Sequence, residues 1–408
     1  MNPRLRFKQA DGTDYPDWEE KKLGELGTFI RGLSYSRDDV TNKSEKSTLV
    51  LRSNNITESK MLDYMNDLQF VIKEPKEEQI LCKGDIVICM ANGSNRLIGK
   101  SARYDGKYKD KITVGAFCGI FRSNCPMIAY IFQSPAYSDF LSYNLQGGNG
   151  AIGNLKGENL KQFSLLIPSD IEEQEKIADF LSDIDEVILA SDQEVKKLQE
   201  LKKGAMQKIF SQEIRFKKSD GTNYPDWEEK KLGDICNSFS GGTPRTSIEE
   251  YYNGNINFIR SGEIHDSKTE LFISEEGLKN SSAKLVNVGD ILLALYGATS
   301  GEIDLSKING AINQAILCIR PQEGFNKKFI VESFRYNKNK ILKMYLQGGQ
   351  GNLSAQNMLK LYFHFPCLEE QEKIGDFLSD FDEAISLAKQ ELEKWKLLKK
   401  GLLQQMFV

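Results

Sequence analysis

The chain has 408 residues, of which 40% are hydrophobic and 27% are charged, and its formal net charge is −4. This length exceeds that of one ordinary domain, and the composition is that of a folded globular protein, which excludes disordered and fibrous classes. There is no run of about 18 apolar residues, as a membrane helix would need, and the polar start of the chain lacks the apolar core of a signal peptide. We therefore expect a cytoplasmic protein, whose small net charge neither indicates nor excludes nucleic-acid binding.

The seven cysteines and two histidines limit the metal and redox chemistry that is available. The cysteines are odd in number and never spaced as Cys-x-x-Cys, which argues against a disulfide framework and against a zinc site. Three of them lie in apolar, strand-like runs and are expected to be buried thiols: Cys89, Cys118 and Cys318. We predict no metal site.

A long internal repeat determines the expected organisation of the chain. Residues 6–24, RFKQADGTDYPDWEEKKLG, return at residues 215–233 as RFKKSDGTNYPDWEEKKLG, with 16 of 19 positions identical. Between the two copies the sequences diverge but keep their landmarks in order: LRSNNI answers IRSGEI, KGDIV answers VGDIL, and LQGG occurs in both halves. Such a repeat predicts two related domains on a shared scaffold.

Each half contains the same series of expected elements. Strands are predicted at GDIVICM, AFCGIF and SLLIP in the first half and at GDILLAL, AILCIR and YFHFP in the second. Helical spacing followed by Gly-Gly predicts one helix over residues 127–146 and its equivalent over residues 325–346. We expect two mixed α/β domains at residues 20–167 and 229–366.

A helical arm follows each domain, at residues 168–213 and 367–408. The arms open with EEQEKIADFLSDIDEVI and EEQEKIGDFLSDFDEAI, and their apolar residues recur at intervals of four and three, as in a coiled-coil seam. Polar residues interrupt the seam at Ser191, Lys202 and Lys399. Each helix would have about 40 residues and a length of roughly 60 Å. We predict that the two arms pair antiparallel.

The ends of the chain complete this pattern. The first arm leads through Phe210 into the linker repeat at residues 214–228, whereas the second arm ends at the C-terminus and the segment 1–19 begins at the N-terminus. If the two chain ends lie side by side, they recreate the junction between Phe210 and Phe216. The predicted fold is α+β, with two similar domains separated by a two-helix coiled coil in a circular repeat of pseudo-two-fold symmetry.

Motifs that carry catalytic chemistry are not found. The stretch GNGAIG at residues 148–153 fits the dinucleotide pattern, but it follows a predicted helix instead of opening one after a strand. Asp85 and Asp290 follow glycines before strands, where a turn-forming carboxylate is the expected role. The Pro-Pro pair of the amino-methyltransferase motif is missing. We predict no catalytic residues.

The whole chain resembles the specificity subunit of type I restriction–modification enzymes. The resemblance rests on the two domains, each followed by an EEQ.KI..FL...D arm, and on FSGGTPRTSIEEYYNGNINFIRSGEI and GATSGEIDLSKINGAINQAIL in the second half. It implies two target-recognition domains that each read half of a bipartite DNA site, on helices that set the spacer. It also implies two partner modification subunits, which carry S-adenosylmethionine and methylate adenine, and restriction subunits that use ATP and Mg. This chain itself would hold no cofactor.

Candidate DNA-contacting residues were chosen as arginine or lysine for guanine, asparagine or glutamine for adenine, and hydroxyl side chains for phosphates. In the first domain they are Arg31, Tyr35, Arg37, Arg52, Asn54, Asn92, Asn95, Arg96, Lys100 and Gln146. In the second domain they are Thr243, Arg245, Tyr252, Arg260, Tyr296, Asn313, Gln314, Gln347 and Gln350.

Apolar residues beside the seam are candidates for docking the modification subunits, namely Phe180, Val187 and Phe377. A wide seam within the chain itself is the alternative role for these side chains. Two further functions remain open from the sequence: a self-contained DNA methyltransferase or nuclease, and a coiled-coil scaffold without DNA binding. The recognised bases, the spacer length and the methylated positions are not predicted.

Overall fold

The structure is a computed structural model that describes residues 3–57, 60–145, 153–346 and 352–407. It divides into two compact units. Unit 1 combines Met1–Ser191 with Glu391–Val408, and unit 2 is Asp192–Gln390. Within the described ranges, every helix is too short or too polar to span a lipid bilayer.

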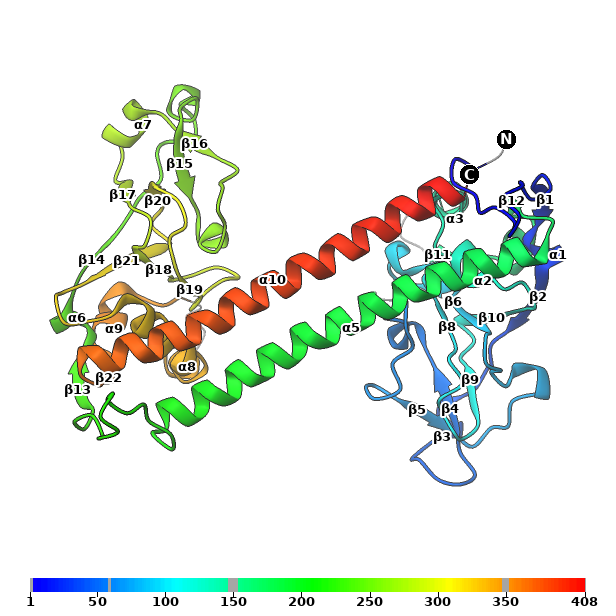
Figure 1. Ribbon diagram of the computed structural model, residues 1–408, viewed down its shortest axis with the longest axis horizontal. Helices are drawn as coiled ribbons and strands as arrows, with labels where there is room; N and C mark the ends of the chain where they lie inside the picture. Colours follow the sequence, from blue (N-terminus) through cyan, green and yellow to red (C-terminus); the bar gives the residue numbers. More distant parts are fainter. Residues whose placement is uncertain (1–2, 58–59, 146–152, 347–351, 408) are drawn as a thin grey trace. The chain divides into compact units, whose positions relative to one another are not determined.

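Unit 1 is built around two four-stranded sheets (Figure 1). The first sheet is antiparallel, in the order β2 (Gly27–Arg31), β10 (Cys118–Ser123), β6 (Ile86–Cys89) and β8 (Ser101–Arg103). Its strand β6 is the apolar run IVIC, and all four residues are buried, as expected for a strand covered on both faces. The second sheet has the order β3 (Val40–Thr41), β5 (Gln69–Val71), β4 (Thr48–Leu51) and β9 (Ile112–Val114), with β4 and β9 parallel.

Unit 2 repeats the strand order of the antiparallel sheet, whereas its second sheet shares the parallel pair but has its extra strand at the opposite edge. Its antiparallel sheet has the order β14 (Cys236–Ser240), β21 (Ile316–Pro321), β18 (Ile291–Ala294) and β19 (Ile303–Leu305). Its second sheet has the order β16 (Phe272–Ile273), β15 (Ile256–Ile259), β20 (Gly310–Ile312) and β17 (Lys284–Val286), with β15 and β20 parallel. The six strands predicted from the sequence are confirmed.

Short strand pairs and helices complete each unit. Unit 1 pairs β1 (Glu19–Lys22) with β12 (Ser164–Ile167) and β7 (Ala91–Asn92) with β11 (Gly153–Asn154), and it contains helices α1 (Leu23–Leu26) and α4 (Gly157–Lys161). Unit 2 pairs β13 (Glu228–Lys231) with β22 (Tyr362–Phe365) and contains helices α6 (Leu232–Ile235), α7 (Glu275–Lys279) and α9 (Ala355–Leu359).

The helices at the predicted ranges 127–146 and 325–346 differ between the units. Unit 2 has one continuous helix, α8 (Lys327–Leu346). Unit 1 has two helices, α2 (Ile128–Ile131) and α3 (Pro135–Asn144), so the prediction of one helix there was wrong. Proline cannot donate the helical hydrogen bond and clashes with the preceding turn, so Pro135 starts a new helix, and the hydroxyl of Ser134 caps it by accepting from the amide of Tyr137.

The two arms are long helices of the predicted length. Helix α5 (Ile171–Phe210) has 40 residues and α10 (Leu368–Met406) has 39. Both open with acidic residues, which interact favourably with the positive end of the helix dipole. Each unit contains the start of one long helix and the end of the other. The predicted architecture of two mixed α/β regions with two long helices is confirmed.

The repeated segment, residues 6–24 and 215–233, makes the same bonds to the start of a long helix in both units. In unit 1 the guanidinium of Arg6 donates from Nε and Nη2 to the fully buried carboxylate of Glu173 at 3.0 and 2.8 Å, and the backbone amide of the preceding Leu5 donates to the carbonyl of Gln405. The start of α5 therefore lies beside the end of α10, which is the predicted antiparallel pairing. We call the arginine–glutamate pair the helix-start clasp.

Unit 2 forms the same clasp from a continuous stretch of chain. Arg215 donates to the buried Glu370 at 3.2 and 2.7 Å, and the amide of Ile214 donates to the carbonyl of Lys208. The two chain ends in unit 1 thus take the place of one connected segment in unit 2, as a circular repeat requires.

The lysines that interrupt the apolar seam are paired across the helices. In unit 1, Lys399 of α10 lies 2.5 Å from Asp185 of α5, and in unit 2, Lys202 of α5 lies 2.7 Å from Asp382 of α10. Lys202 also contacts the buried Glu332 of α8 at 3.0 Å. A polar residue within a coiled-coil seam restricts the register, because other registers leave it without a partner.

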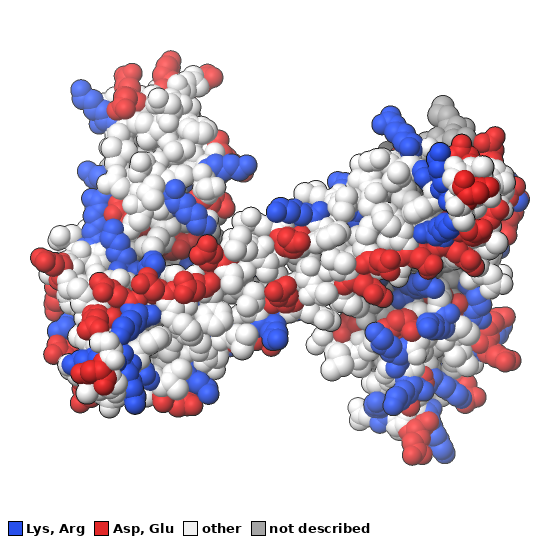
Figure 2. Space-filling view, viewed as in Figure 1, with Lys and Arg blue, Asp and Glu red and all other residues white. Residues whose placement is uncertain are grey.

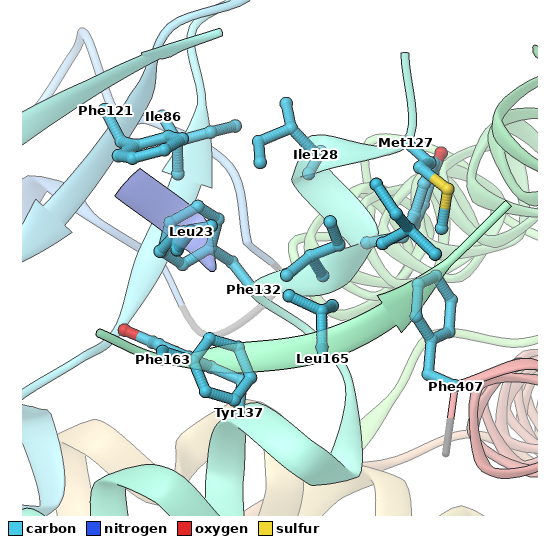
Figure 3. Packing of buried hydrophobic residues seen from close by; sticks show 14 of the residues in the cluster. Leu23, Ile86, Phe121, Met127, Ile128, Phe132, Tyr137, Phe163, Leu165 and Phe407 are labelled. Atoms are coloured by element: carbon cyan, nitrogen blue, oxygen red, sulfur yellow. The ribbon is translucent and has the colours of Figure 1, made fainter. Parts of the chain in front are cut away.

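A large apolar core joins sheet and helices in each unit. In unit 1 it extends from Leu23 and Phe121 through the aromatic residues Phe132 and Tyr137 to Phe407 at the end of the chain (Figure 3). In unit 2 the equivalent core includes residues from both long helices and β22. The expected burial of Cys89, Cys118 and Cys318 is confirmed, and all three are free thiols. Burial raises the pKa of the Cys318 thiol to about 12.

Candidate nucleic-acid interface

Four loops of unit 1 meet around a cavity of about 710 Å³. The cavity is lined by residues 33–35, 52–54, 91–93 and 115–118, which lie at or just beyond the carboxyl ends of β2, β4, β6 and β9, and the third of these connections contains the short strand β7. The loops are joined through their backbones, since the amide of Leu33 donates to the carbonyl of Val114 and the amide of Gly115 donates to the carbonyl of Leu51. We call these four loops the strand-end surface of unit 1.

The strand-end surface brings together four of the residues chosen from the sequence, namely Tyr35, Arg52, Asn54 and Asn92. Asn92 donates from its side-chain amide to the hydroxyl of Ser53 at 3.0 Å, which connects two of the loops. Side-chain amides, a guanidinium and a phenol around one hollow are groups that can pair with the edges of bases.

Unit 2 builds the same surface with other side chains. The amide of Gly242 donates to the carbonyl of Ile312, and the amide of Asn313 donates to the carbonyl of Ile259, so the loops meet as they do in unit 1. We call these loops, residues 242–244, 260–262, 296–299 and 313–315, the strand-end surface of unit 2. Five predicted residues lie on them: Thr243, Arg260, Tyr296, Asn313 and Gln314. The hydroxyl of Thr243 donates to the side chain of Gln314 at 2.6 Å. Tyr296 follows β18 by two residues and belongs to the same loops.

The two equivalent arginines are held by carboxylates. Arg52 donates to Asp67 at 2.8 Å, and Arg260 contacts Glu263 at 3.0 Å and Glu270 at 2.5 Å. These bonds raise the pKa of Arg260, with Glu263 the stronger influence. Each guanidinium is therefore oriented before any ligand arrives.

The other predicted residues lie elsewhere. Arg31, Arg37 and Arg245 are exposed. Tyr252 donates its hydroxyl to the carbonyl of Pro244 at 2.7 Å and packs against the ring of Phe258, so it braces a loop. A second cavity is lined by Arg96 and Lys100, with Asn95 in the turn between lining residues. Gln146, Gln347 and Gln350 fall outside the described residues.

Sequence reasoning missed Phe117, which belongs to the strand-end surface of unit 1, and Asp67, which lies outside that surface but binds two of its residues. Phe117 lines the cavity and is 66% exposed, although the sequence assigned it to the strand that begins only at Cys118. Asp67, which receives bonds from both Arg52 and Asn54, is 13 or more residues distant from them in the chain. Gly115 is a turn signal that could have indicated a loop at Phe117, whereas no local pattern marked Asp67.

Asp85 and Asp290 have the role expected of turn carboxylates. Asp85 accepts from the backbone amide of Cys82, and Asp290 accepts from that of Asn287, at 2.7 and 2.9 Å. Each also pairs with an arginine of the neighbouring strand, Arg122 or Arg320, at 2.7 Å. The backbone bond and the ion pair together stabilise the entry to β6 and to β18.

The candidate docking residues are partly exposed on the arms. Phe180 and Phe377 are covered in part by Phe7 and Phe216 of the repeated segment, at ring distances of 5.5 and 5.6 Å, and Val187 is similarly exposed. Figure 2 shows Lys and Arg interspersed with Asp and Glu on both units, so charge by itself does not mark an interface on this face.

Comparison with known proteins finds matches over nearly the whole chain. Residues 15–203 and 224–396 match the family model described as type I restriction modification DNA specificity domain. The StySPI specificity subunit of Salmonella potsdam is 26% identical over 393 residues, covering 88% of this chain and 80% of that protein. The MjaVIII specificity subunit of Methanocaldococcus jannaschii is 24% identical over 422 residues, covering 97% and 94%. The crystal structure of an S subunit from M. genitalium matches with a TM-score of 0.66 and 16% identity over 100% of this chain and 99% of that one.

Proposed function

The chain belongs to the family of type I restriction modification DNA specificity domains, and we propose that each unit reads one half of a bipartite DNA site through its strand-end surface. The duplex would approach the four loops of each unit, whose amide, hydroxyl and guanidinium groups donate to and accept from base edges. Two surfaces on one chain give one composite target.

One observation carries this proposal: the two units hold equivalent loops with the same backbone bonds but place different side chains on them. Asn54 and Asn92 in unit 1 stand where unit 2 has Gly262 and Gly297, and Ala116 stands where unit 2 has Gln314. Because the donor and acceptor pattern of a base pair selects the side chains that bind it, two different sets of loops read two different half-sites. The target therefore need not be a palindrome.

Catalysis belongs to partner subunits in this proposal. Modification subunits supply S-adenosylmethionine and transfer the methyl group, restriction subunits use ATP and Mg, and this chain selects the site without catalysing a reaction. The long helices α5 and α10 link the two reading units and thereby set the length of the spacer between the half-sites.

The partly exposed Phe180, Val187 and Phe377 of the arms serve as the docking surface for the modification subunits. Replacing Val187 by Asp is the cleaner test, because Phe180 and Phe377 also pack against the repeated segment. We expect this variant to fold with an unchanged circular dichroism spectrum and to lose co-purification with the modification subunits. Full assembly of the variant would contradict this part of the proposal.

The central experiment is to co-express the chain with its modification subunits and to map methyladenine in the host genome. We expect one bipartite motif, and we expect Asn92→Ala to relax bases in one half of it only. Methylation without a bipartite motif, or relaxation in both halves, would refute the assignment of one half-site to each unit. Methyl transfer by the purified chain alone would instead favour a self-contained methyltransferase.

A further inference from the structure

A second cavity in unit 1, of about 520 Å³, is lined by basic residues. Three cations border it, Lys60, Arg96 and Lys100, and there is no Asp or Glu among its described lining residues. Its floor comes from the apolar core, at Phe132 and Tyr137, the two aromatic residues seen beside each other in Figure 3. Hydroxyl and amide groups of Ser94 and Gln133 complete the wall.

The backbone that presents two of these cations is firmly placed. The amide of Gly99 donates to the carbonyl of Cys89, the amide of Cys89 donates to the carbonyl of Lys100, and the buried hydroxyl of Tyr137 donates to the carbonyl of Gly99 at 3.1 Å. Gly99 has φ +80°, a backbone conformation that L side chains rarely adopt, and this favours glycine in the turn.

The charges around this cavity are not balanced within the described chain. No ion pair of Lys60, Arg96 or Lys100 occurs among the described residues. Burial lowers the pKa of Lys60, and the nearby Lys100 and Lys399 lower it further. Like charges that border one hollow repel each other, and an anion that enters the hollow removes that repulsion.

At the equivalent position in unit 2 the cavity is almost completely filled. Gly301 repeats the turn of Gly99 with φ +81°, and its amide donates to the carbonyl of Ala294 as Gly99 does to Cys89. The next residue is Glu302 where unit 1 has Lys100, and it pairs with Lys338 at 2.5 Å. Only about 10 Å³ of cavity remains there. The stretch that carries Arg96 is longer in unit 1, since ten positions separate Cys89 from Gly99 but seven separate Ala294 from Gly301.

We infer that this basic cavity of unit 1 binds a phosphate group, and that unit 2 has no equivalent site. The phosphate is that of the DNA backbone next to the first half-site or that of a free nucleotide, and the first source rests on the proposed function. Proximity favours the backbone: Gly93 lines the strand-end surface and Ser94 lines the basic cavity, so one loop borders both. Consecutive Cα atoms are about 3.8 Å apart, which places the two sites within one duplex contact.

The test uses the full chain assembled with its modification subunits and a target duplex that contains the motif identified by methyladenine mapping. We compare the double variant Arg96→Gln, Lys100→Gln with a control of equal charge, Lys46→Gln, Lys109→Gln, whose lysines are exposed in the same unit. Fluorescence anisotropy from 50 to 300 mM salt gives the slope of log affinity against log salt. We expect the slope to fall in magnitude by about 0.9 in the cavity variant, which is the contribution of the one phosphate contact that is lost, and to stay unchanged in the control. The preferred sequence should be the same in both.

Two further measurements identify the source of the phosphate. Methylphosphonate substituted at single positions should weaken wild-type binding beside the first half-site and have no further effect on the cavity variant. Pyrophosphate and ATP binding are measured by calorimetry without DNA. Loss of their binding in the cavity variant with an unchanged salt slope assigns the cavity to a free nucleotide. Unchanged salt slope and unchanged pyrophosphate binding together overturn the inference. If the wild-type complex selects no duplex, the proposed function fails, and the calorimetry with pyrophosphate still decides whether the cavity binds phosphate.

Discussion

Replacing Glu173 by alanine should open the helix-start clasp of unit 1. The Glu173 carboxylate is fully buried and receives three bonds, two from Arg6 and one from the indole of Trp18 at 3.1 Å. The Arg6 side chain is 16% exposed, so its charge would remain largely buried without a carboxylate partner, although the carbonyls of Tyr15 and Pro16 still accept from it. Removing one partner of a buried ion pair costs about 3–5 kcal/mol, which corresponds to roughly two to four powers of ten in the opening equilibrium.

Hydrogen-exchange mass spectrometry on peptides covering residues 5–18 measures this opening locally, without assuming that both units unfold together. Glu172→Ala is the matched control, because Glu172 is exposed and solvent screens its ion pair with Lys176. Equal loss of protection in Glu172→Ala and Glu173→Ala would refute the reasoning.

The second clasp provides an internal comparison. Glu370 accepts from Arg215 as Glu173 does from Arg6, but the indole nitrogen of Trp227 is buried with no hydrogen-bond partner among the described atoms. A bond to a charged group contributes about 1.5–3 kcal/mol. Glu370→Ala should therefore destabilise its clasp less than Glu173→Ala does, and the reverse order would contradict this account of the indole bond.

Three further predictions concern the turn, the arms and the reading loops. Burial acts to raise the pKa of Asp290, but bonds from Arg320 and a backbone amide outweigh burial and lower the pKa. The stability that this pair contributes is therefore present above the unfolded pKa of about 4 and is lost as pH falls through the lower folded value. Acid unfolding of Asp290→Asn should show a weaker pH dependence over that window, and an unchanged profile would exclude the pair as a cause. Lys399→Met should change the free energy of unfolding by less than about 1 kcal/mol, because the half-exposed Asp185 regains water. A loss of about 3 kcal/mol in a denaturant titration would mean that the ion pair between Lys399 and Asp185 itself holds the two helices together. Gln314→Ala should relax one base pair of a single half-site by about 1–3 kcal/mol when methylation is measured on duplexes varied at each position, and equal weakening on all duplexes would remove Gln314 from base reading.

The repeat explains why so much of the architecture was predictable. Identity at 16 of 19 positions, and the apolar stripe of each arm, are local features that any reader of the sequence can count. The stripe predicts the long helices because one buried face needs an apolar residue at each turn. The helix predicted over residues 127–146 was wrong because the pattern of apolar residues outweighed Pro135, whose ring ends one helix and begins another.

The site was less predictable because base-reading residue types are common on any surface. Tyr35, Arg52, Asn54 and Asn92 were chosen for their chemistry, and the sequence contained no sign that they would line one cavity. Arg96 and Lys100 were chosen in the same way, yet they border a different cavity. Phe117 was assigned to a strand by its apolar neighbours.

The sequence by itself determined the two related units, the two arms, the closure of the repeat and the family, since each is written in local periodicity or in identity between segments. Only the tertiary structure decided which polar residues share a surface, that Arg52 and Arg260 are held by carboxylates, and that one unit keeps an open basic cavity which the other closes with Glu302 and Lys338. The physical reason is the distance along the chain between the residues that interact. Helices and strands follow from interactions between near neighbours in the chain, whereas these pairings join residues that folding brings together from distant positions.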